Sequence, residues 1–210
     1  MNKTLLTGLF YSLLAMNIFA DEVETLELLK LAQSSEKNTS EAIEAGRIRA
    51  SLCGYCHGVQ GTSERNYIPN LAGQNLEYLI HQFQLFASGK RRQSVMEELS
   101  GSLSIQDQVN LSLYYASQIP ERRFDIQGDV RKGMLAFKQS CESCHGIDGV
   151  GNKMIPKLAT QPQFYLKQTL TNLKKHSGHR SVPEMESVLA NITDTMITDI
   201  SAYLSSITSR

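Results

Sequence analysis

The sequence predicts an all-α protein built from two tandem copies of one small module. The pattern Cys-x-x-Cys-His-Gly occurs at residues 53–58 and again at residues 141–146. Residues 68–74 recur 87 positions later as residues 155–161, with Ile, Pro, Leu, Ala and Gln unchanged. Between these motifs, apolar residues fall at three- and four-residue spacing, and no segment alternates as a half-buried strand does. Duplication of one helical module explains these observations together.

The same helices are expected in each module. The matching segments are residues 46–51 and 133–140, which lead into the cysteine motifs, and residues 75–87 and 164–175. Ser104 and Thr193 are suitable N-caps for the last helix of each module. The expected organisation is a signal peptide at 1–20, a short helical extension at 21–43, a first domain at 44–119, a linker at 120–130 and a second domain at 131–210.

The first twenty residues predict export. Lys3 precedes an uncharged apolar stretch that ends in Ile-Phe-Ala, which is typical of a cleavable secretory signal. A retained anchor is the alternative, but sixteen apolar helical residues span only about 24 Å, against about 30 Å of hydrocarbon core. The periplasm of a Gram-negative bacterium is the expected compartment, with peripheral association with the inner membrane as a further option.

The repeated cysteine motif predicts two covalently attached c-type haems. On a helix, cysteines at i and i+3 and a histidine at i+4 share one face, so two thiols meet the porphyrin vinyl groups while the imidazole reaches the iron. The attachment residues are then Cys53, Cys56, Cys141 and Cys144, with His57 and His145 as axial iron ligands. A four-cysteine zinc site or a thioredoxin-like pair is the alternative, but neither uses the two histidines.

Methionine is the expected second axial ligand of each iron. Met96 is the single methionine between residues 44 and 120, and the repeat places Met185 opposite it, 89 positions later. Core packing is the ordinary role of a methionine, but paired positions favour ligation, which raises the reduction potential. His81 is a rival ligand, yet its counterpart is a glutamine; His176 and His179 are expected at the surface.

Short segments around these motifs carry a family resemblance. They are residues 44–47, 71–74, 89–91, 96 and 103–104 in the first half, and residues 178–180, 185 and 192–193 in the second. These segments resemble those of cytochrome c4, the dihaem class I cytochromes c, over residues 44–207. The resemblance implies two class I cytochrome c domains related by a pseudo-twofold axis, with haem edges facing across the interface.

The resemblance also implies roles for residues outside the cysteine motifs. The backbone carbonyls of Pro69 and Pro156 are expected to accept the proximal imidazole N–H, which orients the ligand. Arg91 and Arg180 are candidates for pairing with haem propionates. The second half departs from the first in two places, because Thr160 stands where the first half has a glycine and Thr169 stands where it has a glutamine.

An iron with protein ligands on both faces offers no open position for a substrate, so an electron carrier without catalytic residues is expected. Its partners would be redox proteins, with a respiratory-chain donor and a terminal oxidase or reductase as acceptor. The alternative is the haem subunit of a flavocytochrome c sulfide dehydrogenase. A dihaem enzyme acting directly on peroxide or thiosulfate would need an iron without its distal ligand, and no residue indicates one.

Charge is unevenly distributed along a chain that is neutral overall. Residues 21–43 carry a net charge of −4, residues 44–120 are balanced and residues 121–210 carry +3. The acidic extension would suit a dedicated partner, and the basic second half would steer an acidic redox partner. Nothing in this distribution indicates nucleic-acid binding.

Overall fold

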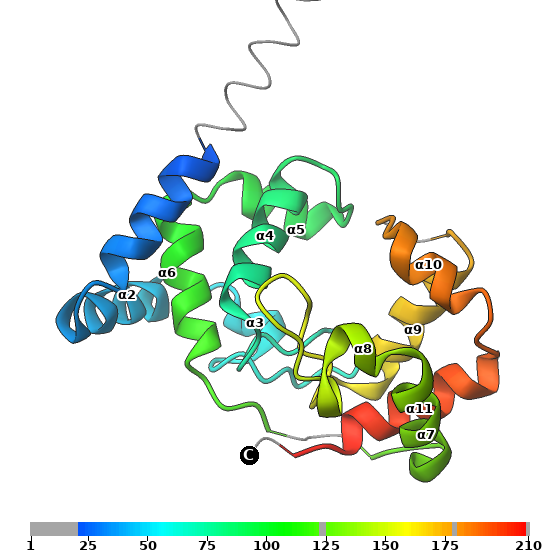
Figure 1. Cartoon of the computed structure of the whole chain (residues 1–210). Coiled ribbons are helices and arrows are strands. Elements are labelled where there is room, and N and C mark those ends of the chain that lie inside the picture. The colour runs from blue at the N-terminus through cyan, green and yellow to red at the C-terminus, as the bar shows by residue number, and fades with distance from the viewer. Residues whose placement is uncertain (1–20, 122–124, 178–179, 209–210) are drawn as a thin grey trace, which may run out of the picture.

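The computed structural model describes residues 21–121, 125–177 and 180–208. The predicted signal peptide, residues 122–124 of the predicted linker and His179 lie outside the described residues. Within those ranges all regular structure is helical and no strand is present, so the prediction of an all-α fold is confirmed. Two groups of helices lie side by side, with long loops between them (Figure 1).

The two groups contain corresponding helices. The first has a helix at residues 21–32, then α2 (Glu36–Arg49), α3 (Gly54–His57), α4 (Leu76–Ala87), α5 (Ser94–Gly101) and α6 (Ile105–Ala116). The second has α7 (Val130–Ser140), α8 (Glu142–His145), a 3₁₀ turn at Ile147–Gly149, α9 (Gln163–Lys174), α10 (Pro183–Leu189) and α11 (Asp194–Ser206). The helices predicted at residues 75–87 and 164–175 are therefore found as α4 and α9.

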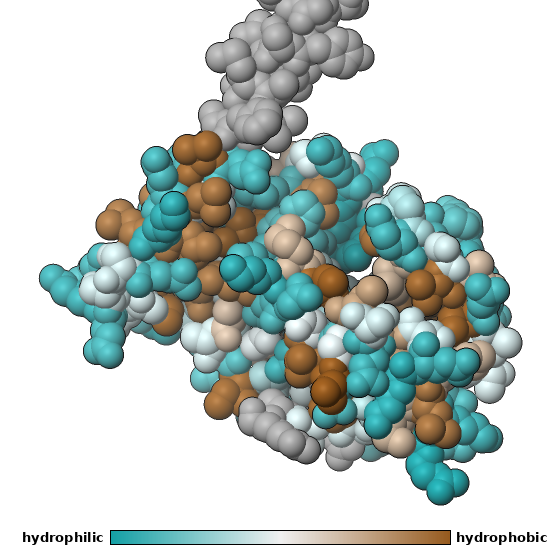
Figure 2. All heavy atoms as spheres, viewed as in Figure 1, coloured by the Kyte–Doolittle hydropathy of each residue, from teal (hydrophilic) through white to brown (hydrophobic). Residues whose placement is uncertain are grey.

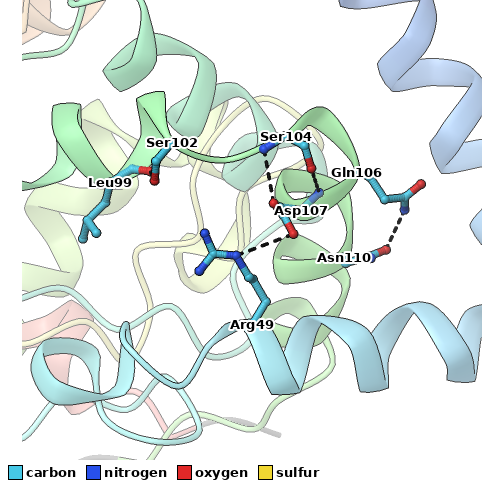
Figure 3. A network of polar contacts seen from close by, with 7 residues as sticks. All are labelled: Arg49, Leu99, Ser102, Ser104, Gln106, Asp107 and Asn110. Carbon is cyan, nitrogen blue, oxygen red and sulfur yellow. Dashed lines mark hydrogen bonds and ion pairs between the residues drawn. The ribbon is translucent and has the colours of Figure 1, made fainter.

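The last helix of each group begins at the predicted cap. The Ser104 hydroxyl accepts the Asp107 N–H at 3.1 Å, and the Asp107 carboxylate accepts the Ser104 N–H at 3.2 Å, which completes a capping box (Figure 3). Arg49, the last residue of α2, reaches the same carboxylate at 3.6 Å and so connects α2 to α6. In the second group Thr193 accepts the Met196 N–H at 3.2 Å.

Two short helices, α5 and α10, were not expected from the sequence. The side chain of Gln93 caps α5 by accepting the Met96 N–H at 2.7 Å. Pro183 is the first residue of α10, a position where its fixed φ suits a helix. With eight and seven residues these helices are too short to show a clear apolar period. The helices α5 and α10 carry Met96 and Met185, each as the third residue of its helix.

Each group is built around one close helix crossing, α2 on α6 and α7 on α11. A Cβ atom on Gly46 would overlap the backbone carbonyl of Asn110, and one on Gly133 would overlap that of Asp199. These glycines occupy matching positions of the repeat. Glycine is required at both because only a residue without a Cβ lets the two backbones approach so closely.

The crossings enclose separate apolar cores. In the second group Phe137 of α7 and Ile197 and Leu204 of α11 are almost completely buried. In the first group Leu111 and Tyr115 of α6 have the same role. The helix at 21–32 adds a further layer on this group, because Ala32 packs with residues of α2, α4 and α6.

The outer face of the N-terminal helix is not covered by other described residues. Val23, Leu26 and Leu31 are exposed there, and apolar atoms gather over this region in Figure 2. The predicted boundary between extension and first domain, at residues 43 and 44, falls inside α2. The extension is therefore continuous with the first helix of the domain that it covers.

The two groups are joined by two equivalent pairs of hydrogen bonds. Each residue of the first pair is replaced in the second pair by its counterpart from the other half of the repeat. The Gln74 amide accepts the Lys157 N–H at 2.7 Å and donates to the Lys157 carbonyl at 2.9 Å. Gln161 forms the same two bonds with Asn70, at 3.0 and 2.8 Å. Gln161 is the counterpart of Gln74, and Lys157 that of Asn70. Such a self-matching interface is twofold, so the implied pseudo-twofold relation is confirmed.

The crossing of α7 and α11 makes a stability prediction. Gly133→Ala should lower the free energy of unfolding by about 1–3 kcal/mol, because the added methyl group forces the two helices apart. Gly101→Ala is the matched control, since a Cβ at Gly101 meets no atom within 4 Å. Urea unfolding of the haem-loaded protein measures both. Equal stability of the two variants would show that the crossing tolerates a side chain.

Candidate haem-attachment sites

The first cysteine motif forms a single short helical turn beside the core of its group. Cys53 is the N-cap of α3 and packs against the cluster that contains Leu111 and Tyr115. His57 ends the turn, and only 9% of its surface is exposed. Gly58 follows with φ +79°, a left-handed value that stops the helix. Cys56 is half-buried. The motif itself places the two thiols and the imidazole within residues 53–57.

The second motif repeats this arrangement. Cys141 is the N-cap of α8 and packs against the core of the second group, while Cys144 is exposed. His145 ends the turn with 5% of its surface exposed, and Gly146 stops it at φ +73°. All four thiols are free of disulfide bonds. Among the described residues no three or more His, Cys, Asp or Glu side chains are grouped so that they could hold a metal ion, so the structure does not gather the two cysteine pairs into one four-cysteine site.

A backbone carbonyl orients each histidine, as the resemblance implied. His57 Nδ1 lies 2.9 Å from the Pro69 carbonyl oxygen, and His145 Nδ1 lies 3.3 Å from that of Pro156. A carbonyl can only accept, so Nδ1 carries the proton and Nε2 keeps its lone pair. Burial lowers the pKa of both imidazoles. The neutral ring with a free Nε2 is the form that binds a metal.

These proline loops also form the contact between the two groups. Asn70 follows Pro69 directly, and its N–H donates to the Gln161 side chain of the other group. Its own amide donates to the carbonyl of Thr160 at 2.8 Å. The peptide unit between Pro69 and Asn70 therefore orients His57 through its carbonyl and holds the interface through its N–H. In the second group the peptide unit between Pro156 and Lys157 does the same.

The departure at Thr160 leaves the backbone unchanged. Thr160 has φ +67°, close to the +61° of Gly73, its counterpart in the first half. This left-handed value costs a β-branched residue more than it costs glycine. The interface bond to the Thr160 carbonyl is made nonetheless. The second half thus keeps the loop geometry at a conformational cost.

The two predicted methionines occupy matching places on α5 and α10. Both are half-buried. Met96 packs against the core cluster that also includes Cys53, and Met185 packs against the cluster that includes Cys141. Met196 also borders the second cluster, so packing alone does not select Met185 there. Of these two methionines, Met185 is the one whose position on its helix matches that of Met96.

The remaining histidines lie elsewhere. His176 Nδ1 contacts the Glu186 carboxylate at 2.9 Å on the surface. His81, on α4, is half-buried, and burial together with the charges of Lys90 and Arg180 lowers its pKa. Those neighbouring cations place His81 in a positive region near the boundary between the two groups.

The comparisons with known proteins agree with this geometry. Residues 128–204 match the family described as cytochrome c oxidase, cbb3-type, subunit III. The chain is 31% identical over 189 residues to cytochrome c4 of Pseudomonas aeruginosa. The matched region covers 84% of this chain and 94% of that protein. The chain belongs to the cytochrome c4 family. Its fold of two cytochrome c domains with covalently bound haem, and its character as an electron carrier, are thereby confirmed at the level of the family.

Solved structures show the same likeness. The crystal structure of reduced recombinant cytochrome c4 from Pseudomonas stutzeri has a TM-score of 0.68 at 28% identity, covering 77% of this chain and 96% of that chain. Thiosulfate dehydrogenase from Marichromatium purpuratum has a TM-score of 0.69 at 26% identity. It covers 78% of this chain, but this chain covers only 40% of the enzyme chain. That likeness therefore does not transfer the enzyme's activity.

The role of the interface glutamines, and of the backbone groups that they bond, was not predicted from the sequence. Gln74 and Gln161 are unchanged between the halves, which was the available signal. Their role depends on how the two groups dock, and a repeat does not specify docking.

Proposed function

We propose that this member of the cytochrome c4 family is a periplasmic carrier that takes electrons from a respiratory-chain donor and passes them to a terminal oxidase or reductase. The observation that carries the proposal is the twice-built arrangement of paired thiols beside a buried histidine whose Nδ1 bonds a proline carbonyl. Both halves keep it although they differ at many other positions. A chain with two such sites suits transfer of electrons between them.

The residues of each half fit a covalently bound haem. Cys53 and Cys56 would form the thioether links of the first, with His57 as proximal ligand and Met96 as distal ligand. The corresponding residues of the second are Cys141, Cys144, His145 and Met185. A haem c with His and Met ligands supplies one-electron chemistry at an exposed edge. The chain's own contribution is to orient each imidazole through a proline carbonyl, and His and Met side chains would be the iron's protein ligands.

The proposed compartment rests on the secretory signal and on the family of this chain. Residues 1–20 have the pattern of a secretory signal. No helix among the described residues is both long and apolar enough to cross a membrane. Members of the cytochrome c4 family, to which this chain belongs, are typically periplasmic. The redox partners would meet the chain at the membrane surface or in the periplasm, and the basic second half favours an acidic partner.

The distal ligands can be tested by substitution. Met96→Ala and Met185→Ala should each lower the potential of one haem and open its iron to cyanide or carbon monoxide, because the thioether that favours reduced iron is lost. Met154→Ala is the matched control, since Met154 is 51% exposed. Spectroelectrochemical titration and ligand-binding spectra measure these effects. If neither of the first two variants binds external ligands better than the parent, the distal assignment is wrong.

The direction of electron flow can be tested with membranes of the source bacterium. The reduced protein should be reoxidised by these membranes, and an inhibitor of the terminal oxidase should stop the reaction. The haem subunit of a flavocytochrome is the rival function. If the protein instead co-purifies with a flavoprotein that reduces it at the expense of sulfide, and membranes leave it reduced, the carrier proposal is wrong.

A further inference from the structure

An asparagine of the first domain donates hydrogen bonds to a loop of the second. Asn75 Nδ2 lies 2.8 Å from the carbonyl oxygens of Asn152 and Ile155 and 3.3 Å from that of Val150. All three acceptors are carbonyls, so the NH₂ group of the Asn75 amide faces them. They belong to the loop at residues 150–155, which extends from α8 toward α4 (Figure 1).

This loop leads directly to the carbonyl that orients His145. The Gly151 N–H donates to the His145 carbonyl at 2.7 Å, and Asn152 and Ile155 exchange two backbone bonds at 3.0 and 3.1 Å. A Cβ atom on Gly151 would overlap the carbonyls of Ile155 and Pro156. The loop is therefore a closed turn packed against the Pro156 carbonyl, which accepts the His145 Nδ1–H at 3.3 Å. A contact that fixes the loop also fixes this carbonyl.

Asn75 does not have the usual role of a residue at its position. It is the N-cap of α4, where an asparagine side chain ordinarily accepts an N–H from the first turn of its own helix. In the described part of α4, the Asn75 side chain accepts no such bond. Its amide donates to the other domain instead. The position thus gives up a helix cap for a contact across the interface.

A second residue of α4 reaches the same loop. The Glu77 carboxylate lies 3.9 Å from Lys153 Nζ, but the lysine side chain is 82% exposed. An exposed pair of this kind contributes little. Among the described residues, no side chain other than Asn75 donates a hydrogen bond to a carbonyl of residues 150–155. Asn75 is therefore the principal side-chain support of this loop.

The first domain supports its corresponding loop with its own side chains. Asn70 Oδ1 accepts the Ser63 N–H at 2.8 Å, and the Ser63 hydroxyl donates to the Arg65 carbonyl at 3.0 Å. The second domain has Lys157 at the place of Asn70, and residues 150–155 include no hydroxyl side chain. The supports within the first loop are thus missing from the second.

The position that corresponds to Asn75 cannot return the contact. That counterpart is Pro162, which has neither an N–H nor a side-chain donor. The first loop does receive a bond across the boundary, from the Tyr165 N–H to the Asn66 carbonyl at 3.0 Å. Its donor is a backbone group, so it depends on no particular side chain. The side-chain support therefore runs in one direction, from the first domain to the second loop.

We propose that Asn75 is a positioning residue for the proximal histidine of the second haem. By holding residues 150–155 it fixes the Pro156 carbonyl, and with it the ring orientation and the Nδ1 proton of His145. The proposal rests on the proposed function, because it requires His145 to be an iron ligand. It makes the ligand geometry of the second domain depend on its docking with the first.

The test follows exchange of the two histidine Nδ1 protons with D₂O, by proton NMR of the reduced, haem-loaded, full-length protein. Nuclear Overhauser contacts with Pro69 and Pro156 assign the two signals. The variant is Asn75→Ser, because serine is an equally good N-cap but its side chain is one bond too short to reach the loop. Exchange at His145 should become about tenfold faster, because two hydrogen bonds that hold the loop are lost. Exchange at His57 should not change.

Three controls separate positioning from general loosening. The buried Leu204 amide of α11 should keep its exchange rate in Asn75→Ser, which distinguishes opening of the loop from unfolding of the domain. Ser63→Ala removes a support of the first loop and should speed exchange at His57 alone. Asn191→Ser, at an exposed asparagine of the second domain, should change neither histidine.

Two results of Asn75→Ser would overturn the proposal. One is unchanged exchange at His145. The other is equal acceleration at His145 and at either His57 or the Leu204 amide. A parent protein that holds fewer than two haems would instead contradict the proposed function, and its haem content is measured before the exchange experiment.

Discussion

The hydrogen bond from each motif histidine to a proline carbonyl is the contact on which the other features of this structure depend. In the first domain it fixes the proton on Nδ1 of His57 and leaves Nε2 for the iron. The next residue, Asn70, bonds to Gln161 of the second domain. One peptide unit thus orients the ligand through its carbonyl and holds the interface through its N–H. Movement of one domain against the other would disturb the histidines directly.

The duplicated frame carries two sites that differ in detail. The helix crossings, the proline carbonyls and the interface glutamines follow the twofold axis. Other positions do not, because Gln82 of the first half is replaced by Thr169 and the left-handed Gly73 by Thr160. Two haems in unequal surroundings have unequal potentials, which would give electrons a preferred order. The frame is thus symmetric, and the local differences distinguish the two sites.

Much of this organisation could be predicted from the sequence because its signals are local. The cysteine motifs, the caps at Ser104 and Thr193 and the apolar periods of α4 and α9 each involve residues close together in the chain. The helices α5 and α10 were missed because their short length gives no clear period. The contacts of Asn75 with the loop at residues 150–155 were missed because they join residues 75 to 80 positions apart. Docking of two domains creates such pairs, and no local pattern encodes them.

The central claim is that each half of the exported chain holds a haem through its own pair of cysteines. Mass spectrometry of the protein from the periplasm, followed by peptide analysis, tests it most directly. The account predicts a chain without residues 1–20 that carries two haems, one on the peptide with Cys53 and Cys56 and one on the peptide with Cys141 and Cys144. An exported chain with unmodified cysteines, or with haem on only one of these peptides, would contradict it.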